Sequence, residues 1–254
     1  MIQGLDLFKT QFAPFSGHYT LIGGTACFLL MDDVGLSFRA TKDLDIVLCV
    51  EDLNPAFVQA FWSFVRAGQY QHRQKSTGKS LFYRFQNPGD DRYPSMLELF
   101  SRRLDTLTLS EGAHVTPIPV DGEVSSLSAI LLDQDYYHLI QTGRDTVAGI
   151  SIVTAPYLIP LKAKAWLDLS ERRQAGDTID SRSITKHRND VFRLYQIVAP
   201  DQKILLPDSI RVDLRNFMDK MAGEVGIDLK TLGLRNVQID ELFDTLRNIY
   251  GIGD

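Results

Sequence analysis

Leu21-Ile22-Gly23-Gly24-Thr25 is followed, after a gap long enough for one helix, by Arg39-Ala40-Thr41-Lys42-Asp43-Leu44-Asp45-Ile46-Val47-Leu48. This order predicts a strand, a tight glycine turn, a helix and then a second strand. Because side chains alternate along a strand, we expect Asp43 and Asp45 to leave the second strand on one face, about 6 to 7 Å apart. Two carboxylates at that separation can bind one divalent cation, a geometry that suits metal-dependent transfer of phosphoryl or nucleotidyl groups.

The glycine turn in front of the helix complements such a metal site. Gly23 and Gly24 allow the backbone to approach a ligand closely, because neither carries a Cβ atom. Thr25 lies at the start of the predicted helix, where a hydroxyl and unpaired backbone N–H groups can meet phosphate oxygens. We therefore expect the turn to hold a triphosphate and the second strand to hold the metal.

A third acid, Glu98, stands in the apolar run Met96-Leu97-Glu98-Leu99-Phe100. An acid in an apolar strand must either face water or be held by a cation. If this strand lies beside the Asp43/Asp45 strand, Glu98 becomes the third carboxylate of the metal site. The alternative is that Glu98 points to solvent from a half-exposed strand.

Composition sets broad limits on the class of protein. The chain has 254 residues, of which 44% are hydrophobic and 23% are charged, as in ordinary globular proteins. No stretch reaches the ~18 uninterrupted apolar residues of a membrane span, and the first residues lack the pattern of a signal peptide, so we expect a cytoplasmic enzyme with no membrane partner. Cys27 and Cys49 have no metal-site spacing, and we expect two buried thiols.

The net charge of −5 argues against a protein that coats nucleic acid through bulk electrostatics. A local basic groove is still compatible with that charge. The run from Arg66 to Arg84 contains no acid and mixes basic with aromatic side chains, namely Arg66, Tyr70, His72, Arg73, Lys75, Lys79, Phe82, Tyr83 and Arg84. Such a run can contact phosphates and stack bases, although a solvated hairpin or loop is an equally good interpretation.

Hydrophobic periodicity and turn residues divide the chain into further elements. Strands are predicted at Tyr19–Ile22, Asp43–Val50, Lys79–Gln86, Met96–Phe100, Val115–Val120, Ala129–Leu132, Tyr136–Gln141 and Gly149–Thr154. Helices are predicted at Thr25–Met31, Ala56–Arg66, Pro156–Leu169, Lys186–Ile197, Ser209–Met221 and Asp240–Tyr250. The turn at Asn87–Asp91 makes a hairpin of its flanking strands, and the polar segment Glu171–Thr185 is interpreted as a flexible connection.

Two lysines, Lys162 and Lys164, lie in an otherwise apolar helix, and Asp190 begins the apolar stripe of the next one. A lysine on the buried side needs an anion, and a triphosphate is one such anion. Asp190 would then order the lysine or act as a base toward an incoming hydroxyl. The alternative is that both lysines reach water and that Asp190 interacts with the helix dipole.

Taken in order, these motifs resemble a known family. Gly23-Gly24-Thr25, Arg39-x-Thr41-x-Asp43-Leu44-Asp45, Leu161-Lys162-Ala163-Lys164 and Lys186-x-x-x-Asp190 are similar to the motifs of the abortive-infection type IV toxin nucleotidyltransferases (AbiEii/AbiGii-like), within the DNA polymerase β-like superfamily. The match runs from about Tyr19 to Leu194, and threonine stands at position 41 where many relatives have serine.

The resemblance implies an α+β fold with a nucleotidyltransferase-type mixed-sheet core in residues 1–155, flanked by helices. A helical domain in residues 156–254 would contribute to the nucleotide site. It also implies Mg²⁺-dependent transfer of an NMP from an NTP, in some members to tRNA, and neutralisation by a cognate antitoxin. The resemblance also implies a role for each matching residue. Gly24 and Thr25 would bind the triphosphate, and Asp43 and Asp45 would bind the metal ions. Lys164 would be the motif lysine, with Lys162 as the second choice, and Asp190 would be the aspartate of the last motif.

The predicted site residues include those that the resemblance implies and those that the residue patterns above single out. The catalytic candidates are Asp43, Asp45, Glu98, Lys164 and Asp190, and the metal ligands, for two Mg²⁺ ions, are Asp43, Asp45 and Glu98. The nucleotide-binding candidates are Gly23, Gly24, Thr25, Arg39 and Lys162.

Three functions compete at this point. The first is a toxin-like nucleotidyltransferase acting on RNA, which the motif set and the basic run favour. The second is a nucleotidyltransferase acting on a small hydroxylated molecule such as an aminoglycoside, for which the acid-rich Asp133-Gln134-Asp135 would supply an acceptor pocket. The third is a catalytically silent nucleotide-binding protein, against which the retained carboxylates argue.

Overall fold

The structure is a computed structural model of the chain and describes residues 2–71, 83–102, 115–118, 127–224 and 227–253. Contacts within the chain divide it into two compact units. The sheet unit comprises Met1–Asp33 and Arg39–Val153, and the helical unit comprises Val34–Phe38 and Thr154–Asp254.

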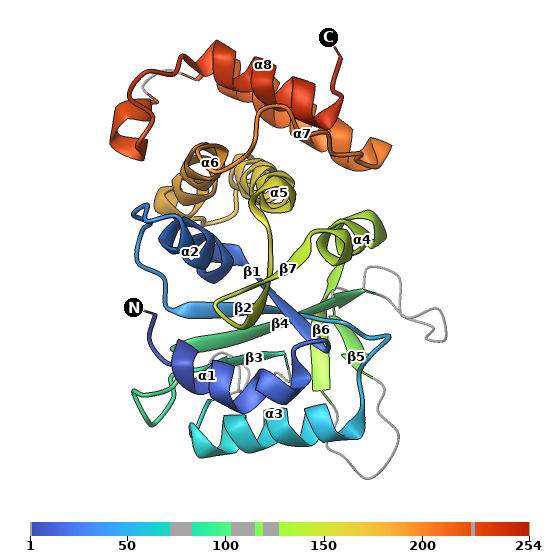
Figure 1. Cartoon of the computed structure of the whole chain (residues 1–254). Helices are drawn as coiled ribbons and strands as arrows, with labels where there is room; N and C mark the ends of the chain where they lie inside the picture. The colour runs from blue at the N-terminus through green and yellow to red at the C-terminus, as the bar shows by residue number, and fades with distance from the viewer. Residues whose placement is uncertain (1, 72–82, 103–114, 119–126, 225–226, 254) are drawn as a thin grey trace. The chain divides into compact units, whose positions relative to one another are not determined.

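One mixed sheet forms the centre of the sheet unit (Figure 1). Its strands, within the described residues, are β1 (Tyr19–Ile22), β2 (Asp43–Leu48), β3 (Arg84–Gln86), β4 (Met96–Arg102), β5 (Val115–Ile118), β6 (Leu127–Leu132), β7 (Arg144–Val147) and β8 (Ile150–Val153). The strand order is β5-β6-β4-β2-β1-β8-β7, and β3 pairs with β4 outside this path. Strand β2 pairs antiparallel with β1 and parallel with β4, so it lies in the interior of the sheet.

Helices cover both faces of this sheet (Figure 1). One face carries α1 (Leu5–Phe12), the short η1 (Ala13–Phe15) and α3 (Pro55–Ala67), and the other carries α2 (Gly23–Asp33) and α4 (Gln134–Thr142). Helix α3 begins where the Asn54 side chain accepts the N–H of Phe57 and Pro55 takes the first helical position, two common features of a helix start.

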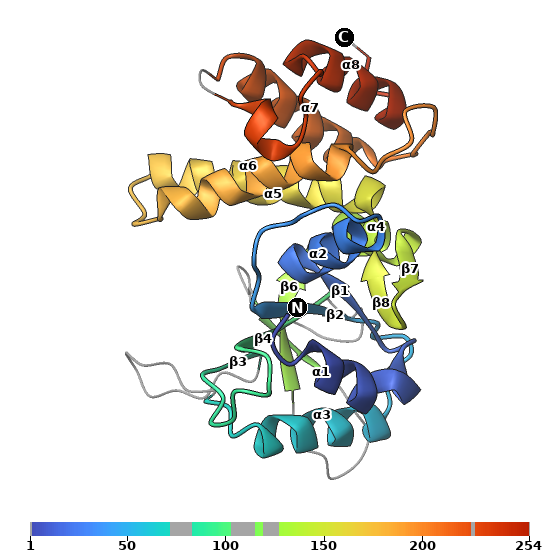
Figure 2. The same cartoon turned by 60° about the vertical axis from the view of Figure 1, so that its left-hand side comes forward.

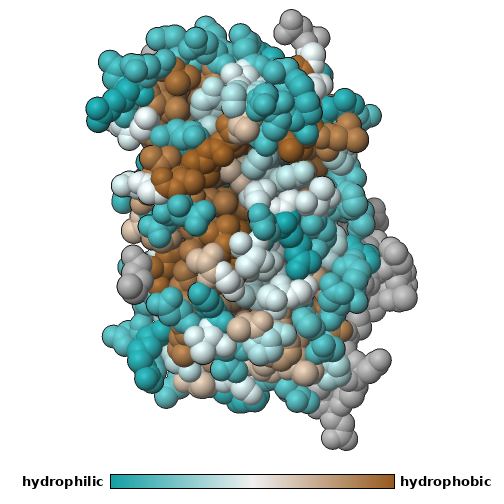
Figure 3. All heavy atoms as spheres, in the orientation of Figure 1, coloured by the Kyte–Doolittle hydropathy of each residue, from teal (hydrophilic) through white to brown (hydrophobic). Residues whose placement is uncertain are grey.

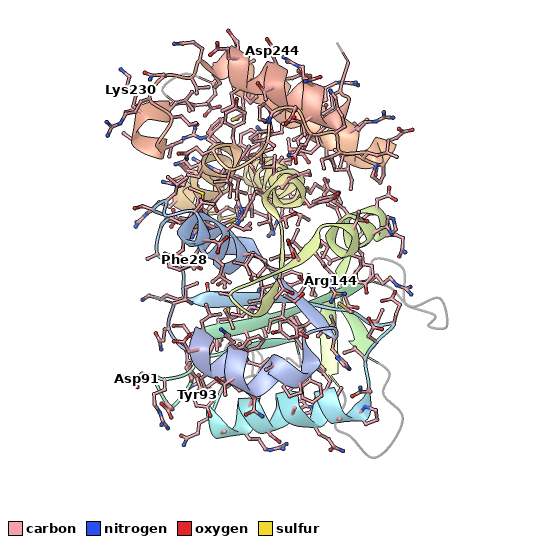
Figure 4. The ribbon with its side chains drawn as sticks, in the orientation of Figure 1. Phe28, Asp91, Tyr93, Arg144, Lys230 and Asp244 are labelled. Atoms are coloured by element: carbon pink, nitrogen blue, oxygen red, sulfur yellow. The ribbon has the colours of Figure 1, made fainter. Side chains whose placement is uncertain are left out.

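Aromatic side chains fill the space around α1 and α3. Phe8 and Phe12 of α1 contact Phe64 of α3, with ring centroids 5.9 and 5.4 Å from it. The ring of Tyr93, labelled in Figure 4, packs on Phe64 at 4.8 Å. Because buried aromatic rings contribute a large share of core stability, this cluster fixes α1 and α3 together.

The helical unit consists of α5 (Ala155–Gln174), α6 (Ser181–Tyr195), α7 (Asp208–Ala222), η2 (Leu229–Leu232) and α8 (Ile239–Tyr250). Helices α5 and α6 lie side by side, α7 packs on α5, and α8 packs on α7 (Figure 2). Ring contacts between Trp166 and Phe217, and between Phe192 and Phe243, join these helices across the core. The visible side of α8 is largely hydrophilic (Figure 3), and Asp244 and Lys230 point outward from this unit (Figure 4).

The predicted fold class is confirmed, since a mixed sheet flanked by helices is followed along the chain, in the residues described there, by helices without further strands. The hairpin around Asn87–Asp91 is confirmed as the antiparallel pair of β3 and β4. Much of the basic run, residues 72–82, lies outside the described residues, as do residues 119–120 of the strand predicted from Val115. Both cysteines are buried, and burial raises the pKa of the Cys49 thiol to about 11.

Two predictions of secondary structure are wrong. The strand predicted at Tyr136–Gln141 is part of α4, because Asp133 caps a helix through the N–H groups of Asp135 and Tyr136, and its buried residues follow a helical spacing. The connection predicted at Glu171–Thr185 is mostly helical, since α5 continues to Gln174 and Asp180 caps α6. Helix α1 was not predicted, although its buried residues Leu5, Phe8 and Phe12 repeat at helical spacing.

Among the residues that the structure describes, no helix has both the length and the apolar character needed to cross a bilayer.

Candidate active site

The two aspartates of β2 lie on the face of the sheet that α2 covers. On β3, Phe85 packs against Phe61 and Trp62 of α3, and Phe85 is in register with Leu97 of β4. Because side chains alternate, the neighbouring residues of these strands face the other way. Asp45 is in register with Glu98, and Asp43 is two residues before Asp45 on the same strand. The predicted common face of Asp43, Asp45 and Glu98 therefore follows from strand register.

Gly23 touches the carboxylate of Asp45. Ile22, the last residue of β1, is the register partner of Asp45, and the chain turns into α2 at Gly23 with φ of 70°. A Cβ atom at Gly23 would lie 1.8 Å from Asp45 Oδ2, so only glycine leaves room for this carboxylate. The glycine turn is thus in direct contact with the carboxylate of Asp45, a predicted metal ligand.

Gly23→Ala is expected to lower the free energy of unfolding by more than the usual cost of about 1 to 2 kcal/mol for a left-handed alanine, because Asp45 must also move. Gly35→Ala is the matched control, since Gly35 has φ of 72° and a Cβ atom there would meet no neighbouring atom within 4 Å. Urea unfolding of both variants measures the difference. Equal losses for the two variants would contradict the described contact.

Gly24 faces a second group of polar side chains. A Cβ atom there would lie 2.7 Å from Thr41 Oγ1 and 3.3 Å from a guanidinium nitrogen of Arg39. The predicted nucleotide-binding residue Arg39 is therefore beside the glycine turn, and its positive charge lies close to the first turn of α2. Cations near unpaired N–H groups make a helix start attractive to anions.

Thr25 is fully buried and ties α2 to β2. Its hydroxyl donates a hydrogen bond of 2.8 Å to the backbone carbonyl of Asp43. A hydroxyl has a single proton to donate. That proton is used within the sheet unit, so backbone N–H groups of α2, rather than the Thr25 hydroxyl, are left to meet phosphate oxygens.

Glu98 is held by a cation, as one of the two sequence interpretations required. Its side chain is only 11% exposed, which rules out the alternative of a solvent-facing acid. Arg84 of β3, its register partner, donates from Nε to Glu98 Oε1 at 2.5 Å, and its Nη2 contacts the same oxygen. The sequence singled out Arg84 as part of the basic run but did not predict this pairing.

The other predicted residues belong to the helical unit. There Lys162 of α5 pairs with Asp190 of α6, with Nζ 3.1 Å from Oδ2, and the two side chains are 4% and 0% exposed. Arg193 lies 3.7 Å from the other oxygen of Asp190. The lysine that Asp190 contacts is thus Lys162, the second choice in the sequence analysis.

Lys164 has different partners. Its ammonium lies 3.2 Å from Asp168 and 3.3 Å from Asp213, and the side chain is partly exposed. Burial alone would lower the pKa of Lys164, but the two carboxylates outweigh that effect and raise the pKa above its usual value. Lys164 is therefore a charged lysine that joins α5 to α7.

The donor set of β2 suits magnesium. Mg²⁺ keeps several waters and is bound in proteins by one or two carboxylates together with substrate phosphates. Asp43 and Asp45 supply two such carboxylates on one face, next to a helix start that can hold phosphates. Within the described part of the chain, no group of three or more His, Cys, Asp or Glu residues is arranged to hold a metal ion. Glu98 is instead engaged by Arg84.

Two solved structures are similar to this chain at low sequence identity, whereas no protein-family model and no curated protein matches it. The crystal structure of an antigenic nucleotidyltransferase-like protein from Paracoccidioides brasiliensis has a TM-score of 0.42 and 17% identity over 96% of this chain and 100% of that chain. The solution structure of the antibiotic-resistance factor ANT(2'')-Ia has a TM-score of 0.37 and 12% identity over 85% of this chain and 91% of that chain.

Proposed function

We propose that this protein transfers a nucleoside monophosphate from a nucleoside triphosphate to a hydroxyl group of an RNA acceptor, with tRNA as the first candidate. The observation that carries the proposal is the contact between Asp45 and Gly23. This contact places two carboxylates of the kind that bind Mg²⁺ next to the start of a helix, where backbone N–H groups attract phosphate. A triphosphate bound there would share its oxygens with the metal.

In this reaction the acceptor oxygen forms a bond to the α-phosphorus, and pyrophosphate leaves as the bond to the bridging oxygen breaks. Bound Mg²⁺ would neutralise charge on the phosphate oxygens. The chain itself contributes the carboxylates of Asp43 and Asp45, the N–H groups of α2 and the guanidinium of Arg39 beside Gly24. A carboxylate of the same face takes the proton of the acceptor hydroxyl.

Two parts of the proposal rest on the sequence. The acceptor is assigned as RNA because the run from Arg66 to Arg84 combines basic and aromatic residues without an acid. The role as a toxin with a cognate antitoxin rests on the family resemblance. Lys164 and Asp190 stay predicted members of the nucleotide site, although their contacts within the helical unit are also those of structural ion pairs.

The acid-rich segment that would favour a small-molecule acceptor has another explanation. Asp133 accepts the N–H groups of Asp135 and Tyr136 and caps α4. This is a common structural use of an aspartate at a helix start. No described contact of this segment indicates an aminoglycoside site. Aminoglycosides are nevertheless included as acceptors in the test below.

The test is incubation with each α-labelled NTP, Mg²⁺ and either total tRNA or a set of aminoglycosides. We expect label to move to tRNA with one preferred NTP, and Asp43→Asn to abolish the transfer. Label on an aminoglycoside alone would replace the RNA acceptor by a small molecule. Transfer that persists in Asp43→Asn would refute the metal site, and NTP binding without any transfer would indicate a silent nucleotide-binding protein.

The toxin assignment is tested separately. We expect induced expression of the chain to stop bacterial growth, and Asp43→Asn to relieve the arrest. If a small helix-turn-helix protein is encoded immediately upstream, its co-expression should restore growth. Normal growth under strong induction of the active protein would leave the transferase proposal intact and remove the toxin role.

A further inference from the structure

A cavity of about 630 Å³ lies in the helical unit, where the later part of α5, the first turns of α6 and the end of α7 meet. Its lining residues all belong to this unit, and they differ from those predicted for the nucleotide site. Cavities of about 300 to 1,000 Å³ are the usual size of small-molecule sites in proteins. This cavity is therefore large enough to hold one nucleotide.

The side chains around the cavity carry an excess of positive charge. Among the described lining residues, Arg173, Arg188 and Lys220 are cations and Glu224 is the one acid. The whole chain has a net charge of −5, so this excess is local and does not reflect the composition. Concave surfaces with one predominant sign of charge concentrate ions of the other sign. The cavity is thus expected to attract an anion.

Arg188 is the cation that most needs a further partner. Its side chain is only 17% exposed, and its described contacts are a hydrogen bond of 3.2 Å from Nε to Asn189 Oδ1 and a long contact of 3.5 Å from Nη1 to Glu224. A guanidinium has five N–H donors, of which these contacts use two. A charge that has lost most of its water is stabilised by each added hydrogen bond to an anion. An anion in the cavity would supply such bonds.

The ion pairs at the cavity are easily exchanged. Lys220 lies 3.4 Å from Glu171, and both side chains are well exposed. Glu224, the partner of Arg188, is 44% exposed, and Arg173 is exposed as well. Exposed pairs of this kind contribute little to stability. A phosphate can therefore take the place of these carboxylates at little cost.

The cavity also has an apolar part. Trp166 and Ile184 line it, although both side chains are largely buried, and the Trp166 ring is held edge-on against Phe217. Ser170 and Thr185 add hydroxyl groups. A flat base can lie on such an apolar surface while its ribose and phosphate meet hydroxyl and guanidinium groups. An acidic peptide would use the charges but not the aromatic surface, so the lining favours a nucleotide.

We propose that this cavity binds one nucleotide of the acceptor RNA, with its phosphate on Arg188 and its base against Trp166. Arg173 and Lys220 would contact neighbouring phosphates of the same strand. The inference rests on the proposed function, to which it adds a docking site for the acceptor. Because none of these residues belongs to the proposed metal site, RNA binds here without NTP and without the carboxylates of β2.

The experiment measures binding of total tRNA to the full chain in the absence of NTP. The sequence contains two tryptophans, so Trp62→Phe leaves Trp166 as a reporter in the cavity lining. We expect tRNA to quench Trp166 fluorescence in a saturable manner. In this background, Arg173→Gln/Arg188→Gln should weaken tRNA binding by about tenfold or more and reduce the slope of log Kd against log salt by about 1.5, because two phosphate contacts are lost.

The matched control removes two cations of the same unit that do not line the cavity. Arg211→Gln/Arg215→Gln changes α7 at side chains that make other contacts. We expect this variant to bind tRNA within about twofold of the protein with intact arginines. Should the loss of Arg188 unfold the chain, which thermal unfolding would show, Arg173→Gln/Lys220→Gln carries the same test with two exposed side chains.

The outcomes separate this inference from the proposed transferase. Equal affinities of the cavity variant and the control for tRNA would refute the cavity site, while label transfer to tRNA would leave the transferase intact. Unchanged Trp166 fluorescence while labelled tRNA is retained on a filter would likewise refute it. Failure of every protein to bind tRNA would refute both the cavity site and the RNA acceptor. Quenching by polyglutamate but not by tRNA would assign the cavity to an acidic protein partner instead.

Discussion

Asp45→Asn is expected to slow nucleotide transfer by about 1000-fold or more while the protein stays folded. The substitution keeps the size of the side chain and its packing against Gly23 but removes the charge that binds the cation. A metal ion supplies several kcal/mol of charge stabilisation in the transition state, and about 4 kcal/mol corresponds to a factor of 1000. Single-turnover rates at saturating NTP measure the effect, with circular dichroism as the check on folding.

Asp91→Asn is the control for this prediction. Asp91 is an exposed aspartate on the segment between β3 and β4, as labelled in Figure 4, so the same chemical change there should leave the rate within about twofold. A rate for Asp45→Asn within tenfold of the unmodified protein would show that the catalytic cation is not held by Asp45. Partial rescue of Asp45→Asn by Mn²⁺ in place of Mg²⁺ would support the assignment.

Asp190→Ala is expected to lower the free energy of unfolding of the helical unit by about 3 to 5 kcal/mol. It leaves the ammonium of Lys162 buried without its carboxylate, and breaking a buried ion pair from one side carries a cost of that size. Replacing both partners, as in Lys162→Met/Asp190→Leu, should recover much of the loss because the buried ammonium is removed together with its carboxylate. Urea unfolding followed by tryptophan fluorescence measures all three proteins, since Trp166 lies on α5.

The matched control is Lys164→Met on the same helix. Lys164 is partly exposed, and its pairs with Asp168 and Asp213 should be worth about 1 kcal/mol or less. The contrast tests whether Lys162 or Lys164 is the structurally important lysine. The catalytic role predicted for Asp190 is tested by Asp190→Asn, and a variant with unchanged stability and no transfer activity would support that role.

Local patterns were enough to predict the centre of the sheet. β1 and the start of β2 were predicted from short apolar runs, and the shared face of Asp43 and Asp45 follows from a spacing of two residues. The same use of local patterns gave a wrong prediction at α4, because the segment from Tyr136 to Gln141 is apolar enough for a short strand. The capping aspartate at position 133, which decides for a helix, was interpreted as part of an acidic pocket.

Contacts between distant residues were beyond such patterns. The sequence required that Glu98 face water or meet a cation, but the antiparallel register of β3 on β4 made Arg84 that cation. Likewise Lys162 and Lys164 are two residues apart on one helix and therefore point in different directions, so the packing of α6 and α7 against α5 decided their partners.

The amino-acid sequence by itself determined the glycine turn at Gly23 and the spacing of the two carboxylates on β2, because each depends on residues that are neighbours along the chain. The mixed sheet pairs strands that are distant in sequence, and it was expected only from the family resemblance. The tertiary structure alone decided that Asp45 rests against Gly23, that Arg84 holds Glu98 and that Asp190 holds Lys162. The reason is physical, since a charge removed from water must find an opposite charge nearby, and which one is near depends on how strands and helices pack.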